Sequence, residues 1–118
     1  MGLLSRLLGS RPDESAVTHA VADAVAATPG VSAHSLTYNH QQYKGGALSG
    51  VVDVADTPAF LGVLRTSYSV LTDLLGDDVN RVTFYLSGRT PDGDSVVPGD
   101  LGMAQPPTGR DLGAHLSP

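Results

Sequence analysis

The feature of this sequence that most constrains its fold is a repeated change in hydrophobic period, from helical spacing to strand alternation. Apolar residues recur at helical spacing over 13–28 and 56–75, and they alternate every second residue over 31–40, 47–54 and 80–89. The chain therefore has the order helix–strand–strand–helix–strand. We predict one α+β domain, a two-layer sandwich with two helices on one face of a three- to four-stranded, mostly antiparallel sheet.

Glycine and proline mark the ends of these elements. Pro29-Gly30 ends the first helix, and the loop 41–46 contains a Gly-Gly pair suited to a hairpin. Asp56-Thr57-Pro58 is a typical helix start, and Gly76 fits the position just after the helix end. Gly50 interrupts the second strand, which predicts a bulge or the close approach of another backbone.

The composition divides the chain into three segments. Residues 1–12 form a leucine-rich amphipathic segment, and 13–98 form the α+β domain. The end of that domain carries a strong turn at 90–94 and a short edge strand over 95–97. From 99 to 118 proline, glycine and polar residues dominate, which predicts a partly ordered tail.

Charge and composition exclude several classes of function. Seven basic residues oppose twelve acidic ones, giving a net charge of −5, which argues against nonspecific nucleic-acid binding. Cysteine is absent, so thiol catalysis, disulfides and thiolate metal sites are excluded. The sequence contains no secretory signal and no apolar run of the ~18–20 residues that a membrane span requires. We expect a cytoplasmic protein.

His34 and His40, with Asp53 on the paired strand, are the best metal or acid–base candidates. A metal site needs at least three convergent ligands. The two histidines are separated by six strand residues, roughly 20 Å at the usual strand rise, so they cannot share one ion without a sharp bend. We therefore predict solvent-facing histidines, with no metal and no cofactor.

The N-terminal segment is the first of two candidate interaction surfaces. Its leucines lie on one helical face: Leu3, Leu4, Leu7 and Leu8. Two turns are too few for a stable free helix, so this segment would order only against something else. We expect a reversible anchor, on a membrane surface or in a partner's groove; the alternative is that the segment docks on its own domain or is disordered.

The sheet face that the helices leave uncovered is the second candidate surface. The residues assigned to it are His34, Tyr38 and His40 or their alternates, together with Val51, Thr83 and Tyr85. Exposed aromatic and β-branched side chains on such a face often mark a partner or self-association surface. Full solvation of this face is the alternative.

The element order over residues 15–88, with the turn Pro29-Gly30-Val31 between the first helix and the first strand, resembles two groups of proteins. One is the ferredoxin-like and ring-building α-β-β-α-β modules. The other is the alkaline-shock-protein family, whose members run helix, Gly-Val turn, strands, helix and strand. The resemblance implies a fold, and folds of this kind host unrelated functions.

These observations favour a non-enzymatic interaction module. It would self-associate or bind a protein partner through the sheet face, with residues 3–8 attached to a partner or to the periphery of a membrane. The alternative is a small enzyme or ligand-binding protein with a pocket between sheet and helices, using His34 or His40 together with Tyr38.

Overall fold

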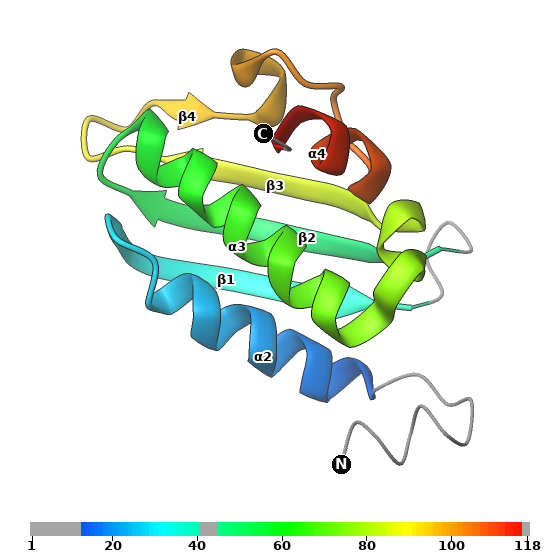
Figure 1. Cartoon of the computed structure of the whole chain (residues 1–118). Helices are drawn as coiled ribbons and strands as arrows, with labels where there is room; N and C mark the ends of the chain where they lie inside the picture. Colours follow the sequence, from blue (N-terminus) through cyan, green and yellow to red (C-terminus); the bar gives the residue numbers. More distant parts are fainter. Residues whose placement is uncertain (1–12, 41–44, 117–118) are drawn as a thin grey trace.

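The computed structural model describes residues 13–40 and 45–116, which form helices on a four-stranded sheet (Figure 1). In chain order the elements are α2 (Glu14–Ala26), β1 (Val31–Asn39), β2 (Ala47–Val54), α3 (Thr57–Leu75), the 3₁₀ segment η2 (Gly76–Arg81), β3 (Thr83–Arg89), β4 (Ser95–Val96), the 3₁₀ segment η3 (Pro98–Leu101) and α4 (Gly109–Leu116).

The sheet has the strand order β1-β2-β3-β4, so every strand lies beside its neighbour in sequence. Strands β1 and β2 form an antiparallel hairpin, β2 and β3 are parallel and joined through α3, and β3 pairs antiparallel with β4. This mixed sheet with its helices confirms the predicted α+β class.

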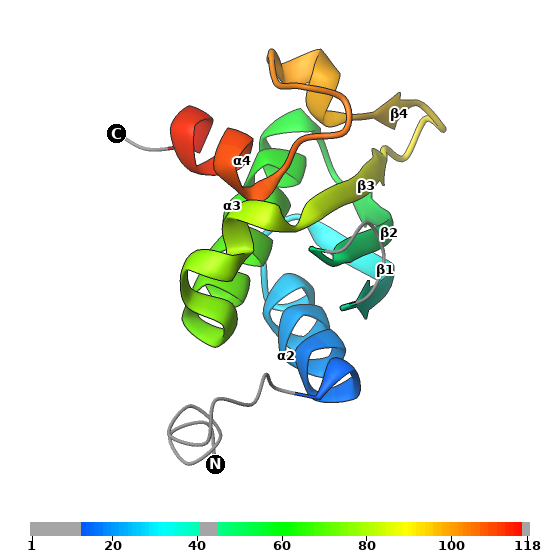
Figure 2. The same ribbon diagram turned by 90° about the vertical axis from the view of Figure 1, so that its right-hand side faces the viewer.

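Helices α2 and α3 pack side by side on one face of the sheet, and the opposite face carries no element of the described chain (Figure 2). The core between helices and sheet is built mainly from valine, leucine and phenylalanine. Its fully buried members include Val17, Val21, Val25, Leu48, Val52, Phe60, Val63, Leu64, Leu71, Val82 and Phe84.

The ends of α3 follow the local chemistry of the sequence. The Asp56 carboxylate accepts a hydrogen bond from the Ala59 backbone N–H at 2.9 Å, which caps the first turn. After Leu75 the chain turns at Gly76, whose φ of 61° lies in the left-handed region.

Helix α2 has no side-chain cap at its start, because the side chain of Asp13 makes no capping hydrogen bond. Its other end is tied to α3 by the Thr28 hydroxyl, 3.1 Å from that of Thr66.

The prediction that another backbone approaches Gly50 closely is confirmed. A Cβ added at Gly50 would lie 2.0 Å from the carbonyl oxygen of Ser35 on β1. Only a residue without a side chain therefore allows β1 to lie this close to β2.

Two segments differ from the prediction. The third strand begins at Thr83, and not at residue 80, because η2 continues the chain after α3 and buries Val79 in the core. The partly ordered tail predicted from residue 99 onward instead contains most of η3 and the whole of α4. Leu112 of α4 is fully buried, so this segment packs on the domain because it covers the remaining apolar surface beside α3.

None of the helices within 13–40 and 45–116 has the length and apolarity needed to cross a membrane.

Candidate interaction surface

The uncovered sheet face presents every second residue of three strands, and most of them are small or hydroxyl-bearing. These residues are Ala33, Ser35, Thr37 and Asn39 of β1, Ser49, Val51 and Asp53 of β2, and Thr83, Tyr85, Ser87 and Arg89 of β3. We call this set the open face. On the other side of the sheet most of the alternate side chains, such as Leu36, Leu48 and Phe84, are buried beneath the helices.

Val51 and Tyr85 lie at the centre of the open face. They are 43% and 39% exposed, and among the described residues they are the exposed large hydrophobic side chains. Their strands are adjacent, with Ser49 paired to Tyr85 and Val51 paired to Ser87. Val51 and Tyr85 are thus diagonal neighbours, a separation that an aromatic side chain can bridge. The exposed large hydrophobic side chains of the described residues are therefore gathered at one place.

An ion pair closes one end of the open face. The Arg89 guanidinium contacts the same Asp53 carboxylate oxygen through Nε at 3.0 Å and through Nη2 at 2.9 Å. Since Asp53 and Arg89 are directly paired across β2 and β3, their charges neutralise one another. The open face consequently presents polar groups with little net charge.

Tyr38 does not lie on the open face, which corrects the assignment made from the sequence. It is only 2% exposed, because it shares the inward parity of Leu36 on β1 and packs beneath the helices. The residues before and after it on the strand, Thr37 and Asn39, are the ones that face outward. His34 has the same parity as Tyr38 but is exposed, near the beginning of β1.

Tyr38 and His40 are brought together, whereas His34 is not near them along the strand. The His40 Nδ1 lies 3.2 Å from the Tyr38 hydroxyl, and the rings meet edge to face with centroids 5.0 Å apart. Within the described ranges no three histidine or acidic side chains are grouped so that they could hold a metal ion. Asp53, the proposed third member of such a site, instead binds Arg89.

The outer edge of β1 is partly closed by two side chains of α2 that sequence reasoning missed. The Thr18 hydroxyl accepts a hydrogen bond from the Tyr38 backbone N–H at 3.0 Å, and the Glu14 carboxylate accepts one from the His40 N–H at 2.6 Å. The signal was present, because Glu14 and Thr18 are polar residues four apart on one side of a helix.

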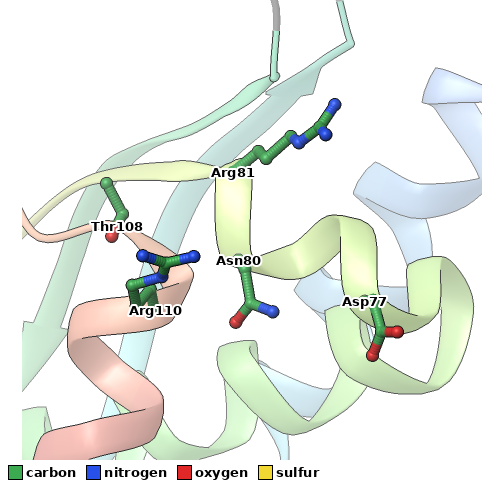
Figure 3. Close-up of a pocket in the computed structure, with 5 residues that line it drawn as sticks. All are labelled: Asp77, Asn80, Arg81, Thr108 and Arg110. Atoms are coloured by element: carbon green, nitrogen blue, oxygen red, sulfur yellow. The ribbon is translucent and has the colours of Figure 1, made fainter.

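A groove of about 490 Å³ lies between η2 and the start of α4, lined by Asp77, Asn80, Arg81, Thr108 and Arg110 (Figure 3). Arg110 extends toward Asn80, while Arg81 points away from it. The Thr108 hydroxyl is already engaged with Asp111 of α4 at 3.1 Å. The groove thus has only one guanidinium directed across it, and an acidic residue at its side.

The leucine-rich segment with Leu3, Leu4, Leu7 and Leu8 lies outside the described residues, so its role stays a prediction. Comparison of the chain with protein-family models, with curated proteins and with solved structures found no match. The resemblance to ferredoxin-like, ring-building and alkaline-shock proteins therefore rests on element order and the turn Pro29-Gly30-Val31.

Proposed function

We propose that this protein is a non-enzymatic interaction module that binds a protein partner through the open face. The observation that carries the proposal is the placement of Val51 and Tyr85 as diagonal neighbours at the centre of an uncovered sheet. Isolated exposed hydrophobic residues are common on protein surfaces, but a central apolar pair inside a polar rim has the organisation of a binding surface.

The size of the open face argues for a weak or transient contact. Seven paired positions along three strands span roughly 23 by 14 Å, or roughly 300 Å² in plan. A stable interface buries about 800 Å² on each partner. A lasting complex would need additional contacts, and Leu3, Leu4, Leu7 and Leu8 of the N-terminal segment are the residues that we propose for this role, on the partner or on the periphery of a membrane.

The chemistry of the face defines the partner. The Asp53–Arg89 pair leaves no uncompensated charge between β2 and β3, and the surrounding residues are uncharged: most bear a hydroxyl group, and the others are Ala33 and Asn39. A complementary surface has aliphatic or aromatic side chains at its centre and neutral hydrogen-bonding groups around them. A polyanion such as nucleic acid does not fit this description, because its binding depends on clustered basic side chains.

The test is site-specific photo-crosslinking in cells that express the full chain. A benzophenone amino acid at position 85 keeps an aromatic ring at the centre of the open face. We expect it to form an adduct of discrete mass with a partner protein. The matched control carries the same group at position 69, where Ser69 is exposed on the outer side of α3.

A second variant connects the adduct to the apolar centre. Val51→Ser removes the other exposed hydrophobic side chain of the open face. It should leave the fold unchanged, because this side chain is not part of the buried core. It should reduce the yield of the adduct at position 85 several-fold. Equal adduct formation at positions 85 and 69, or a yield unaffected by Val51→Ser, would contradict the proposal.

One contact favours the alternative, a ligand-binding or catalytic site. The Tyr38 hydroxyl lies within hydrogen-bonding distance of the ring of His40, an arrangement that could exchange a proton with a bound molecule. Native mass spectrometry of the purified protein tests it. A carried ligand that is lost in Tyr38→Phe and His40→Ala, and kept in His34→Ala, would favour this function over the interaction module.

A further inference from the structure

The two middle strands of the sheet, β2 and β3, present large and small side chains alternately on the open face. Val51 of β2 is paired with Ser87 of β3. Two residues back along both strands, Ser49 is paired with Tyr85. Val51 and Tyr85 are the exposed large hydrophobic residues of the described chain, so each of them lies directly beside a serine of the neighbouring strand. The large residue is on β2 in one pair and on β3 in the other.

This pattern becomes its own complement when the two strands are exchanged. A two-fold axis that runs along the strands, midway between β2 and β3, makes this exchange between two copies that face each other. It places Tyr85 of each copy over Ser49 of the other, and Val51 of each copy over Ser87 of the other. Every large side chain then packs on a small one. Sheets that pack face to face keep their strands within about 30° of each other and interdigitate their inner side chains in this way.

The charged pair of the open face fits the same axis. Asp53 of β2 is paired with Arg89 of β3, so the axis brings Arg89 of each copy over Asp53 of the other. The two contacts within one copy are both made to a single oxygen of the Asp53 carboxylate. In the face-to-face arrangement the four charges alternate in sign around the axis. Opposite charges therefore meet across the contact, and like charges do not.

The axis also lies at the centre of the whole sheet. With the strand order β1-β2-β3-β4, a line between β2 and β3 leaves two strands on each side, so β1 of one copy lies over β4 of the other (Figure 1). Both strands present small uncharged side chains there: Ala33 and Ser35 on β1, and on β4 Ser95, which is exposed and paired with Arg89. Helices α2 and α3 cover the opposite side of each sheet, so they do not enter the contact (Figure 2).

We propose that the partner of the open face is a second copy of this chain, packed face to face about this axis. The inference rests on the proposed function, because it uses the same surface and names the partner. That partner needs aliphatic or aromatic side chains at its centre and neutral hydrogen-bonding groups around them, and the open face itself has both. Its plan area of roughly 300 Å² is well below the about 800 Å² of a stable interface, so the dimer is weak and reversible.

The experiment measures self-association of the full chain by sedimentation velocity over a concentration series. We expect wild type to dimerise reversibly. Val51→Lys brings two lysines close together across the axis and should raise the dimer dissociation constant at least about tenfold. Ser87→Asp brings two carboxylates together and should do the same. Both side chains point away from the core, so we expect both variants to fold.

The axis also determines which variants complement each other. In a mixed dimer of Val51→Lys and Ser87→Asp, the new lysine of one chain lies opposite the new aspartate of the other. Fluorescently labelled Val51→Lys should therefore bind Ser87→Asp at least about tenfold more tightly than it binds Ser69→Asp. Ser69→Asp is the matched control, because it adds the same charge at an exposed position on the outer side of α3. By itself this control should dimerise as wild type does.

Photo-crosslinking at position 85 separates this inference from the proposed function. The purified full chain should give an adduct of twice the chain mass, with the cross-link at or near Ser49. A wild type that stays monomeric at about 1 mM, a dimer that tolerates Val51→Lys, or equal binding of the two aspartate variants would overturn the inference. If the probe then captures a different protein in cells, the proposed function stands without the second copy. The absence of any specific adduct contradicts both.

Discussion

The two edges of the sheet are closed in different ways. At the β3 edge, the chain itself supplies backbone partners: the Phe84 N–H donates to Pro107 and the Gly109 N–H donates to Val82, each at 2.8 Å, and β4 pairs with Gly88 and Arg89. At the β1 edge, side chains of α2 supply acceptors: the His40 N–H donates to the Glu14 carboxylate and the Tyr38 N–H donates to the Thr18 hydroxyl.

The difference follows from what lies behind each edge. The segment that closes the β3 edge is anchored in the core through Leu112 and fits so closely that a Cβ at Gly109 would lie 1.8 Å from the Val79 carbonyl oxygen. The caps on β1 come from a helix whose next two side chains on that side are alanines. One edge is closed by backbone hydrogen bonds, and the other is flanked by a helix whose side chains supply the acceptors.

The strongest test of this comparison is Leu112→Ala, which removes the anchor of the β3 edge. Leu112 is fully buried, so we expect the free energy of unfolding in urea to fall by about 3 kcal/mol. Ala114→Gly, at an exposed position of the same helix, should cost no more than about 1 kcal/mol. A loss at Leu112 no larger than that of the control would mean that α4 contributes little, and the two edges would then be alike.

Thr18→Val tests the other edge, with a smaller effect on stability. Valine keeps the shape of threonine but removes the acceptor for the Tyr38 N–H, which should cost about 1 kcal/mol. Thr37→Val, at an exposed position of β1, should alter stability by less than about 0.5 kcal/mol. A loss at Thr18 no larger than that of Thr37→Val would mean that the hydroxyl contributes little to this edge.

The sequence predicts best the long elements, in which a regular hydrophobic pattern is bounded by clear end signals. The second helix ends at Leu75 as predicted, because Asp56 and Gly76 fix its two termini independently of the rest of the fold. The short elements are harder to predict. Residues 112–116 are too few to assign as a helix, since α4 is held by tertiary contacts of Leu112 and not by its own propensity.

The candidate surface is predicted only in part, for a reason specific to β1. Alternation locates Val51, Thr83 and Tyr85 on a common side, but on β1 the choice between the two sets of side chains depends on which set packs beneath the helices. Tyr38 and His34 have the same parity, yet the first is buried and the second exposed. The caps from α2 depend on how the helix lies against β1, which no local pattern specifies.

The smallest effect is expected at the Asp53–Arg89 pair, which joins β2 to β3 at the end of the open face. The two side chains are 32% and 60% exposed, so solvent weakens their attraction, and a double-mutant cycle with Asp53→Asn and Arg89→Gln should give a coupling of about 0.5 kcal/mol. The coupling should fall further at high salt. A coupling well above about 1 kcal/mol would mean that this pair helps to hold the strands together. A small value supports a different role, in which the pair neutralises the rim of the open face without contributing to the closure of either edge.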